Sequence, residues 1–172
     1  MDIFTFIVVG AIGGAVLYGI FQSKPTQQDG GRPPPPQPLS APLKAAHERL
    51  SKILADCQAD HHEAASALLW LAGSDGTVSR QELRIIIGFC ERQGAPVEKS
   101  WGSALNFLNS GLNISVTGGE GGAMSNITDL RSKPMSYRIA FVGAVEAIIA
   151  ANKTSNSAKR RLADAARMLV DS

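Results

Sequence analysis

An uncharged apolar stretch near the start of the chain constrains its fold more than any other feature. Residues 3–21 carry no charged side chain, and Thr5 and Tyr18 are their polar exceptions. As a helix rising about 1.5 Å per residue, the stretch reaches about 28 Å, close to the hydrocarbon thickness of a bilayer. A cleaved signal peptide would have a basic start and a small-residue cleavage site, and the Met1-Asp2 start lacks the first of these. The stretch therefore predicts a transmembrane anchor over residues 1–21.

The flanking charges predict an orientation for this anchor. Asp2 precedes the span, whereas Lys24 and Arg32 follow it. Basic flanks stay on the cytoplasmic side, so we expect a single-pass protein of the inner membrane with its N-terminus out and its domain in the cytoplasm. The two cysteines, Cys57 and Cys90, agree with a reducing compartment.

Small residues form a stripe within the predicted span. Gly10 and Gly14 stand at GxxxG spacing. Such spacing lets two membrane helices approach closely, which predicts self-association through these glycines. The simpler interpretation is that glycine is common in membrane helices.

Residues 22–42 form a proline-rich linker. They include four consecutive prolines at positions 33–36. Polyproline segments are extended, at about 3.1 Å per residue, and resist collapse. The composition favours a spacer that holds the domain away from the membrane over a ligand for an aromatic groove.

From residue 43 onward the apolar residues recur at helical spacing, which predicts an all-α domain over residues 43–172. Ser79 and Glu82 form a capping box at the start of one helix, and Gly94 suits its end. The domain is expected to be a small helical bundle behind one N-terminal transmembrane helix. We expect its helices near residues 43–57, 64–71, 79–93, 96–111, 136–152 and 157–170.

A glycine-rich segment interrupts this pattern. Residues 115–125 include four glycines around Glu120. A phosphate-binding loop would need a lysine and a strand-to-helix context, and the segment has neither. We therefore predict a flexible loop here, and residues 114–117 are the one short candidate for a strand.

Residues 68–83 resemble the signature of the TerB-like family, named after a tellurite-resistance protein. An apolar helix is followed by the turn Asp75-Gly76, then by Ser79 and Glu82 at the head of the next helix. The resemblance implies an all-α domain made of two tandem helix pairs. The layout is also similar to the N-terminal part of membrane-anchored J-domain co-chaperones. The sequence contains no J domain, so that chaperone activity is not carried over.

The second copy of this signature would lie at residues 147–160. Alignment sets Asn152 against Asp75 and Lys159 against Glu82, so the second copy lacks both carboxylates. The resemblance implies an acidic site for a divalent cation, and Asp75 and Glu82 suit Ca²⁺ or Mg²⁺ as oxygen ligands. In the alternative interpretation, Asp75 makes the turn and Glu82 completes the capping box.

Other chemistry-bearing residues point to no enzyme. Cys57 and His61 lie one helical turn apart, but a structural zinc site needs four ligands and no second pair has suitable spacing. Both cysteines fall on apolar stripes, where thiols are usually buried and inert. Cysteine–histidine catalysis is therefore not expected.

Seven of the 17 Lys and Arg residues lie between Arg131 and Arg161, with Glu146 as the one acid among them. This run predicts either a basic face toward anionic lipid or a solvated helical surface. No nucleic acid is expected, because aromatic residues do not alternate with the basic ones.

Together these features and the resemblance predict a membrane-tethered binding or signalling module of a stress or defence response. It would contact inner-membrane lipid, act through an unidentified protein partner and depend on a divalent cation if the acidic site is retained. The alternative is a structural assembly subunit that oligomerises through Gly10, Gly14 and the helical domain.

Overall fold

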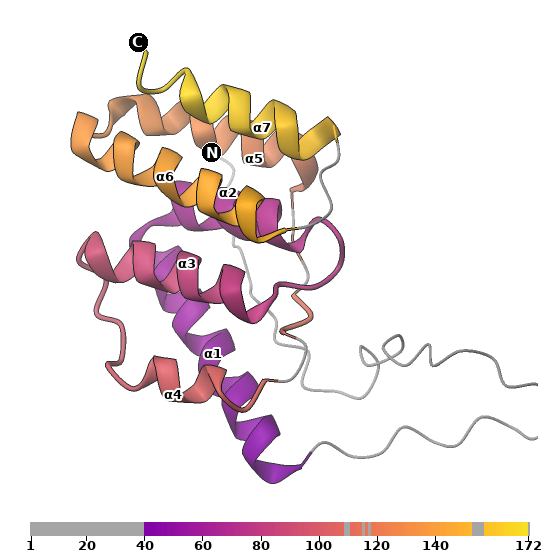
Figure 1. Cartoon of the computed structure of the whole chain (residues 1–172). Helices are drawn as coiled ribbons and strands as arrows, with labels where there is room; N and C mark the ends of the chain where they lie inside the picture. The colour runs from indigo at the N-terminus through magenta and orange to yellow at the C-terminus, as the bar shows by residue number, and fades with distance from the viewer. Residues whose placement is uncertain (1–39, 109–110, 115, 117, 153–156, 172) are drawn as a thin grey trace, which may run out of the picture.

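The computed structural model describes residues 40–108, 111–114, 116, 118–152 and 157–171 of the chain. These residues form an all-α bundle, which confirms the predicted class of the domain (Figure 1). Its elements are α1 (Ala41–Asp60), α2 (His62–Gly73), α3 (Arg80–Arg92), α4 (Trp101–Leu105), α5 (Gly119–Asp129), the 3-10 helix η1 (Leu130–Ser132), α6 (Met135–Ala151) and α7 (Ser157–Arg167).

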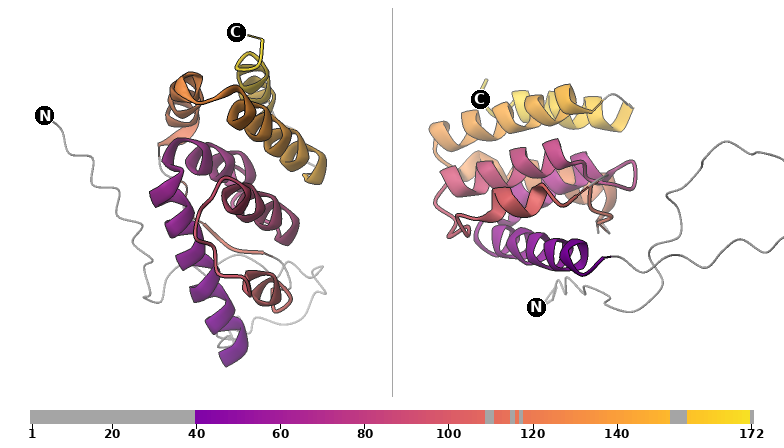
Figure 2. Two further views of the ribbon diagram at one scale, coloured as in Figure 1. Left: turned by 90° about the vertical axis from the view of Figure 1, so that its left-hand side faces the viewer. Right: turned by 60° about the horizontal axis from the view of Figure 1, so that its bottom comes forward.

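Helix α2 occupies the centre of the bundle. It packs against α1, α3, α5 and α6, and six of its side chains are fully buried. Helices α6 and α7 lie on one side of α2 and α3, and α1 lies on the other side (Figures 1 and 2). A helix that is apolar on all sides requires such a central position, because each of its faces needs an apolar neighbour.

The predicted apolar stripes of the first helices are confirmed. The stripe expected to start at Leu43 is half-buried at that residue and buried at the following members: Ala46, Leu50, Ile53, Leu54 and Cys57. The helix begins at Ala41, with Pro42 in its first turn, where proline's missing N–H is not needed.

The capping box of α3 is also confirmed. The Ser79 Oγ atom accepts a hydrogen bond from the Glu82 N–H, and the Glu82 carboxylate accepts one from the Ser79 N–H. Gly94 follows the helix with φ of +99°, a left-handed conformation that glycine adopts without steric strain.

The helix expected over residues 96–111 is much shorter than predicted. The structure forms only α4, Trp101–Leu105, and the residues before it make turns. Arg49 of α1 binds the side chains of Glu98 and Ser100, which holds this segment against α1. After α4, Leu112 forms an isolated antiparallel bridge with Val78 instead of a further helical turn.

The prediction of a flexible loop over residues 115–125 is wrong. Gly118 turns the chain with φ of +87°, and helix α5 begins at Gly119. Ala123 and Ile127 are buried where α5 packs against α2. Tertiary contact with α2 therefore offsets the poor helix propensity of the glycines.

The prediction of a bundle behind a transmembrane helix also needs correction. None of the helices in the described part of the chain is long and apolar enough to cross a bilayer. Helix α6 is apolar but has 17 residues, and α1 has 20 residues but includes charged ones such as Lys44, Glu48 and Asp56. The predicted anchor, its Gly10 and Gly14, and the linker up to residue 39 lie outside the described residues. The location at the inner membrane stays a prediction.

Candidate functional site

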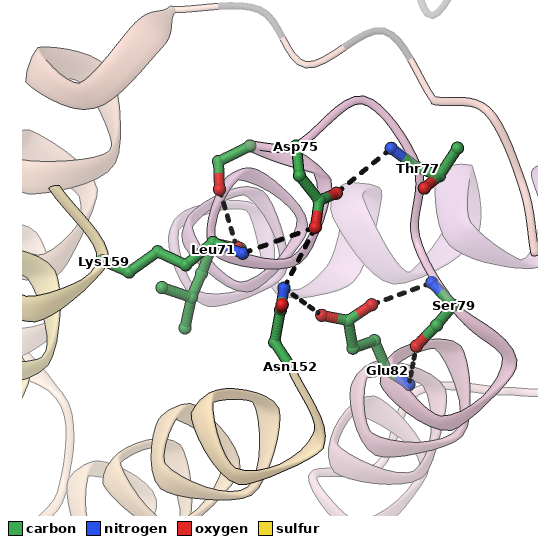
Figure 3. A network of polar contacts seen from close by, with 8 residues as sticks. Leu71, Asp75, Thr77, Ser79, Glu82, Asn152 and Lys159 are labelled. Carbon is green, nitrogen blue, oxygen red and sulfur yellow. Dashed lines mark hydrogen bonds and ion pairs between the residues drawn. The ribbon is translucent and has the colours of Figure 1, made fainter. Parts of the chain in front are cut away.

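The ends of two helix pairs meet at one polar site (Figure 3). Asp75 follows the end of α2, and Glu82 is the third residue of α3. Asn152 directly follows α6, and Lys159 is the third residue of α7. The structure thus brings the two predicted site residues, Asp75 and Glu82, together with the two residues that the sequence aligned to them.

Both oxygens of the Glu82 carboxylate are hydrogen-bonded. Oε2 accepts from the Ser79 backbone N–H at 2.8 Å, and Oε1 accepts from the Asn152 Nδ2 at 3.1 Å. Glu82 is 2% exposed, so its carboxylate loses nearly all of its hydrating water on folding. The two hydrogen bonds compensate for that loss. The capping interpretation of Glu82 therefore accounts for one oxygen, and Asn152 accounts for the other.

Asp75 lies between the turn and the second helix pair. Its Oδ1 accepts from the Thr77 N–H at 3.3 Å, which is the local turn geometry expected of an aspartate. Its Oδ2 accepts from Asn152 Nδ2 at 3.3 Å and lies 3.7 Å from Lys159 Nζ. The Asn152 amide thus bridges both carboxylates, one N–H to each.

Lys159 is the least ordinary member of the site. Its side chain is 4% exposed, whereas that of its ion-pair partner Asp75 is 39% exposed. A buried ammonium group is stable only when paired, because burial removes its hydration. Lys159 therefore ties the first turn of α7 to the turn between α2 and α3.

As arranged here, these residues do not fit a divalent cation. Ca²⁺ needs six to eight oxygen ligands, and Mg²⁺ needs six. The Asn152 amide donates to both carboxylates, and the Lys159 ammonium places a positive charge beside Asp75, so the groups facing the acids are donors and a cation in place of further oxygen ligands. Among the described residues, no group of three or more His, Cys, Asp or Glu could hold a metal ion. Binding of Ca²⁺ or Mg²⁺ stays a prediction that this geometry does not favour.

The cysteines and His61 do not form a reactive cluster. Cys57 and Cys90 are both fully buried. Hydrogen bonding to Cys57, followed by burial, raises the pKa of the Cys90 thiol, so this thiol stays protonated and unreactive.

The Nδ1 atom of His61 contacts the Tyr137 hydroxyl at 3.2 Å, and both rings pack near Phe89. Burial, with smaller effects of Cys90 and Glu63, raises the pKa of Tyr137 to about 12.

The basic run after residue 131 does not form one solvated face. Lys159 is buried, and Lys133 lies 3.8 Å from Glu63. Arg161 makes a two-pronged contact with Glu120 of α5, at 2.7 and 2.9 Å. Much of the run therefore joins one element to another.

An exposed apolar surface is the feature that sequence reasoning missed. Met135 and Ile139, in the first turns of α6, are 43% and 53% exposed, and Met168, just after α7, is 62% exposed. The Arg138 Nη1 atom donates to the Leu169 carbonyl at 2.5 Å, which holds the start of α6 beside the end of α7. We call Met135, Ile139 and Met168 the α6–α7 end patch. The available signal was that α6 has apolar residues beyond its buried stripe, such as Met135 and Ile139.

Comparison with known proteins gives no match: no family model, no curated protein and no solved structure matches this chain. The resemblance of residues 68–83 to the TerB-like family accordingly stays a prediction. What the chain does is inferred from the geometry of its own residues.

Proposed function

We propose that this chain is a helical partner-binding module of the TerB-like type, acting through a protein partner in a stress or defence response. The observation that carries the proposal is the α6–α7 end patch. Of the four large apolar side chains that are most exposed in the described residues, the patch contains three. Single exposed apolar residues are common on soluble proteins, but three at the same end of the α6–α7 pair suit a contact surface.

The chemistry of the patch suits a helical partner. Two of its three residues are methionines, whose flexible and polarisable side chains adapt to different apolar surfaces. The exposed Arg131 lies four residues before Met135, and its positive charge stands near the start of α6 in the chain, whereas Lys133 is paired with Glu63. We therefore expect the partner to present an amphipathic helix, with an apolar face on the patch and acidic residues beside it.

The polar site supports the proposal by attaching the opposite end of the α6–α7 pair to the rest of the bundle. Asn152 and Lys159 bind α6 and α7 to the turn between α2 and α3. A binding surface that is already held in place loses less conformational entropy on association. The TerB-like part of the proposal draws on the resemblance of residues 68–83. It also draws on the polar site, where both acids meet the two residues that the alignment sets against them.

Site-specific photocrosslinking in living cells tests this function. A photoreactive amino acid at position 139 of the full chain should crosslink to one discrete partner, whereas one at the exposed Arg84 of α3 should not. The purified partner should then bind the native chain at least tenfold more tightly than Ile139→Glu, since that change places a charge in the apolar contact. Equal binding by both chains, or equal crosslinking from positions 139 and 84, would refute the proposal.

The alternative, an assembly subunit, makes a different prediction with the same probe. If the patch binds a second copy, crosslinking from position 139 should yield a dimer of this chain. The contact would then be isologous, with the same residues on both copies. Sedimentation of the native chain and of Ile139→Glu would separate the two functions, because only a dimer through the patch becomes monomeric in the variant.

A further inference from the structure

The two helix pairs present matching positions to one another. The buried residues of α6 are Phe141, Ala144, Val145 and Ile148, and the residues aligned to them in α2 are Ala64, Ala67, Leu68 and Leu71, all buried as well. The alignment that sets Asp75 against Asn152 therefore also matches the inner faces of the two helices. It further places Glu82 and Lys159 at the same position, the third residue of α3 and of α7.

The matched positions differ in charge. The first pair contributes two carboxylates, from Asp75 and Glu82, and the second contributes an amide and an ammonium group. The carboxylates of the first pair would repel one another and lose hydration if they faced only apolar atoms. The Asn152 Nδ2 atom carries two hydrogens and donates to both acids, lying 3.3 Å from Asp75 Oδ2 and 3.1 Å from Glu82 Oε1. Lys159 adds a full positive charge 3.7 Å from Asp75.

We propose that Lys159 and Asn152 take the place of a divalent cation between the two helix pairs. The TerB-like resemblance implies such a cation; here the Asn152 amide lies beside both carboxylates and the Lys159 ammonium lies beside Asp75. The Lys159 ammonium supplies the positive charge, and the Asn152 amide supplies the bridge between the two acids. Both groups belong to the chain, so the contact forms without an ion from solution.

We call the contact of Asn152 and Lys159 with Asp75 and Glu82 the joint between the helix pairs. Its stability is independent of the Ca²⁺ or Mg²⁺ concentration. A site that needed Ca²⁺ or Mg²⁺ would let the second helix pair loosen when the ion is removed. With a built-in ammonium, α6 and α7 stay on α2 and α3 under all ionic conditions. This inference goes beyond the proposed function and does not depend on it, because it concerns the joint and not the α6–α7 end patch.

The test restores the missing acids. In the double variant Asn152→Asp/Lys159→Glu of the full chain, four carboxylates would face one another at the joint. We expect this variant to melt at a lower temperature than the native chain in EDTA. Its melting temperature should then rise by about 5–10 °C at a Ca²⁺ or Mg²⁺ concentration near 100 times Kd. The native chain should melt at the same temperature in EDTA and in either cation.

Two further variants keep the test decisive. Arg84→Glu places an acid at an exposed position of α3, and its melting temperature should not respond to cations. Lys159→Gln removes one positive charge, and its melting temperature should rise less with Ca²⁺ or Mg²⁺ than that of the double variant. It also serves as the test if the double variant does not fold in EDTA. Calorimetric titration of Ca²⁺ and Mg²⁺ into each chain gives the binding directly.

Two results would overturn the inference. Saturable binding of Ca²⁺ or Mg²⁺ by the native chain, with a rise in its melting temperature, would mean that Lys159 leaves room for the ion. Absence of any cation response in both Lys159→Gln and the double variant would mean that Lys159 does not occupy a cation position.

Discussion

The helix pairs α2–α3 and α6–α7 have the same layout but different chemistry where their helices join. Their inner faces are buried at matching positions, as in Leu71 and Ile148. The joint of the first pair carries carboxylates, whereas that of the second carries an amide and an ammonium group. Apolar packing tolerates exchange of one aliphatic side chain for another, but a buried charge needs a complementary partner. The comparison shows that the polar positions, and not the apolar ones, distinguish the two pairs.

The largest effect should come from the part that the two pairs share. Leu71→Ala and Ile148→Ala each remove a fully buried side chain, and we expect each to lower the free energy of unfolding by about 2–5 kcal/mol. Urea denaturation followed by circular dichroism measures both. Ile139→Ala, on the outer side of α6, is the control and should change stability by less than about 0.5 kcal/mol. A large loss for Leu71→Ala but a small one for Ile148→Ala would show that the pairs are not equivalent in packing.

The next effect should come from the carboxylate of the first pair. Glu82→Ala removes the acceptor for the Ser79 N–H and for the Asn152 amide, both beside a buried site. Loss of a cap together with an unpaired buried donor should cost about 2–4 kcal/mol of the free energy of unfolding. Glu91→Ala, at an exposed acid near the other end of α3, serves as control in the same urea titration. Similar losses in the free energy of unfolding for the two variants would show that Glu82 does not stabilise the contact between the helix pairs.

A smaller effect is expected at the ammonium group of the second pair. Lys159→Met should lower the free energy of unfolding by about 1–2 kcal/mol, since Asp75 loses its partner but can recover water through its exposed part. Lys52→Met, at an exposed lysine of α1, is the matched control. In a double-mutant cycle, Asp75→Asn should cost less in the Lys159→Met background than in the native chain. Strictly additive losses would contradict a direct contact between Asp75 and Lys159.

The smallest effect concerns a surface ion pair between α7 and α5. Hydrogen bonding to Arg161 lowers the pKa of the Glu120 carboxyl below its usual value of 4.5. The pair therefore contributes stability above about pH 4.5, and this contribution is lost as the pH falls through the lowered pKa. Glu120→Gln should make the stability curve slightly flatter in that acid range and should matter less in high salt. A pH series of urea titrations checks this; an unchanged slope would mean that the exposed pair contributes nothing measurable.

Features set by neighbouring residues could be predicted from the sequence. The apolar stripe of α1, the capping box of α3 and the stop at Gly94 each depend on side chains within a few residues of one another. Local propensity and periodicity contain enough information for such features. The turn at Asp75 and the capping box at Glu82 are also local features. They pointed to two of the four residues that meet at the polar site.

Only the tertiary structure decided the remaining features, because each depends on residues far apart in the chain. Helix α5 forms in a glycine-rich segment because α2 lies against Ala123 and Ile127. The helix predicted after Pro96 is limited to Trp101–Leu105, with Glu98 bound to Arg49 of α1 before it and Leu112 paired with Val78 after it. The sequence by itself determined an all-helical bundle and a pair of acids at one turn. Whether those acids face a metal ion or the chain's own lysine depended on which helix packs across from them, and that choice follows from the packing of the whole core.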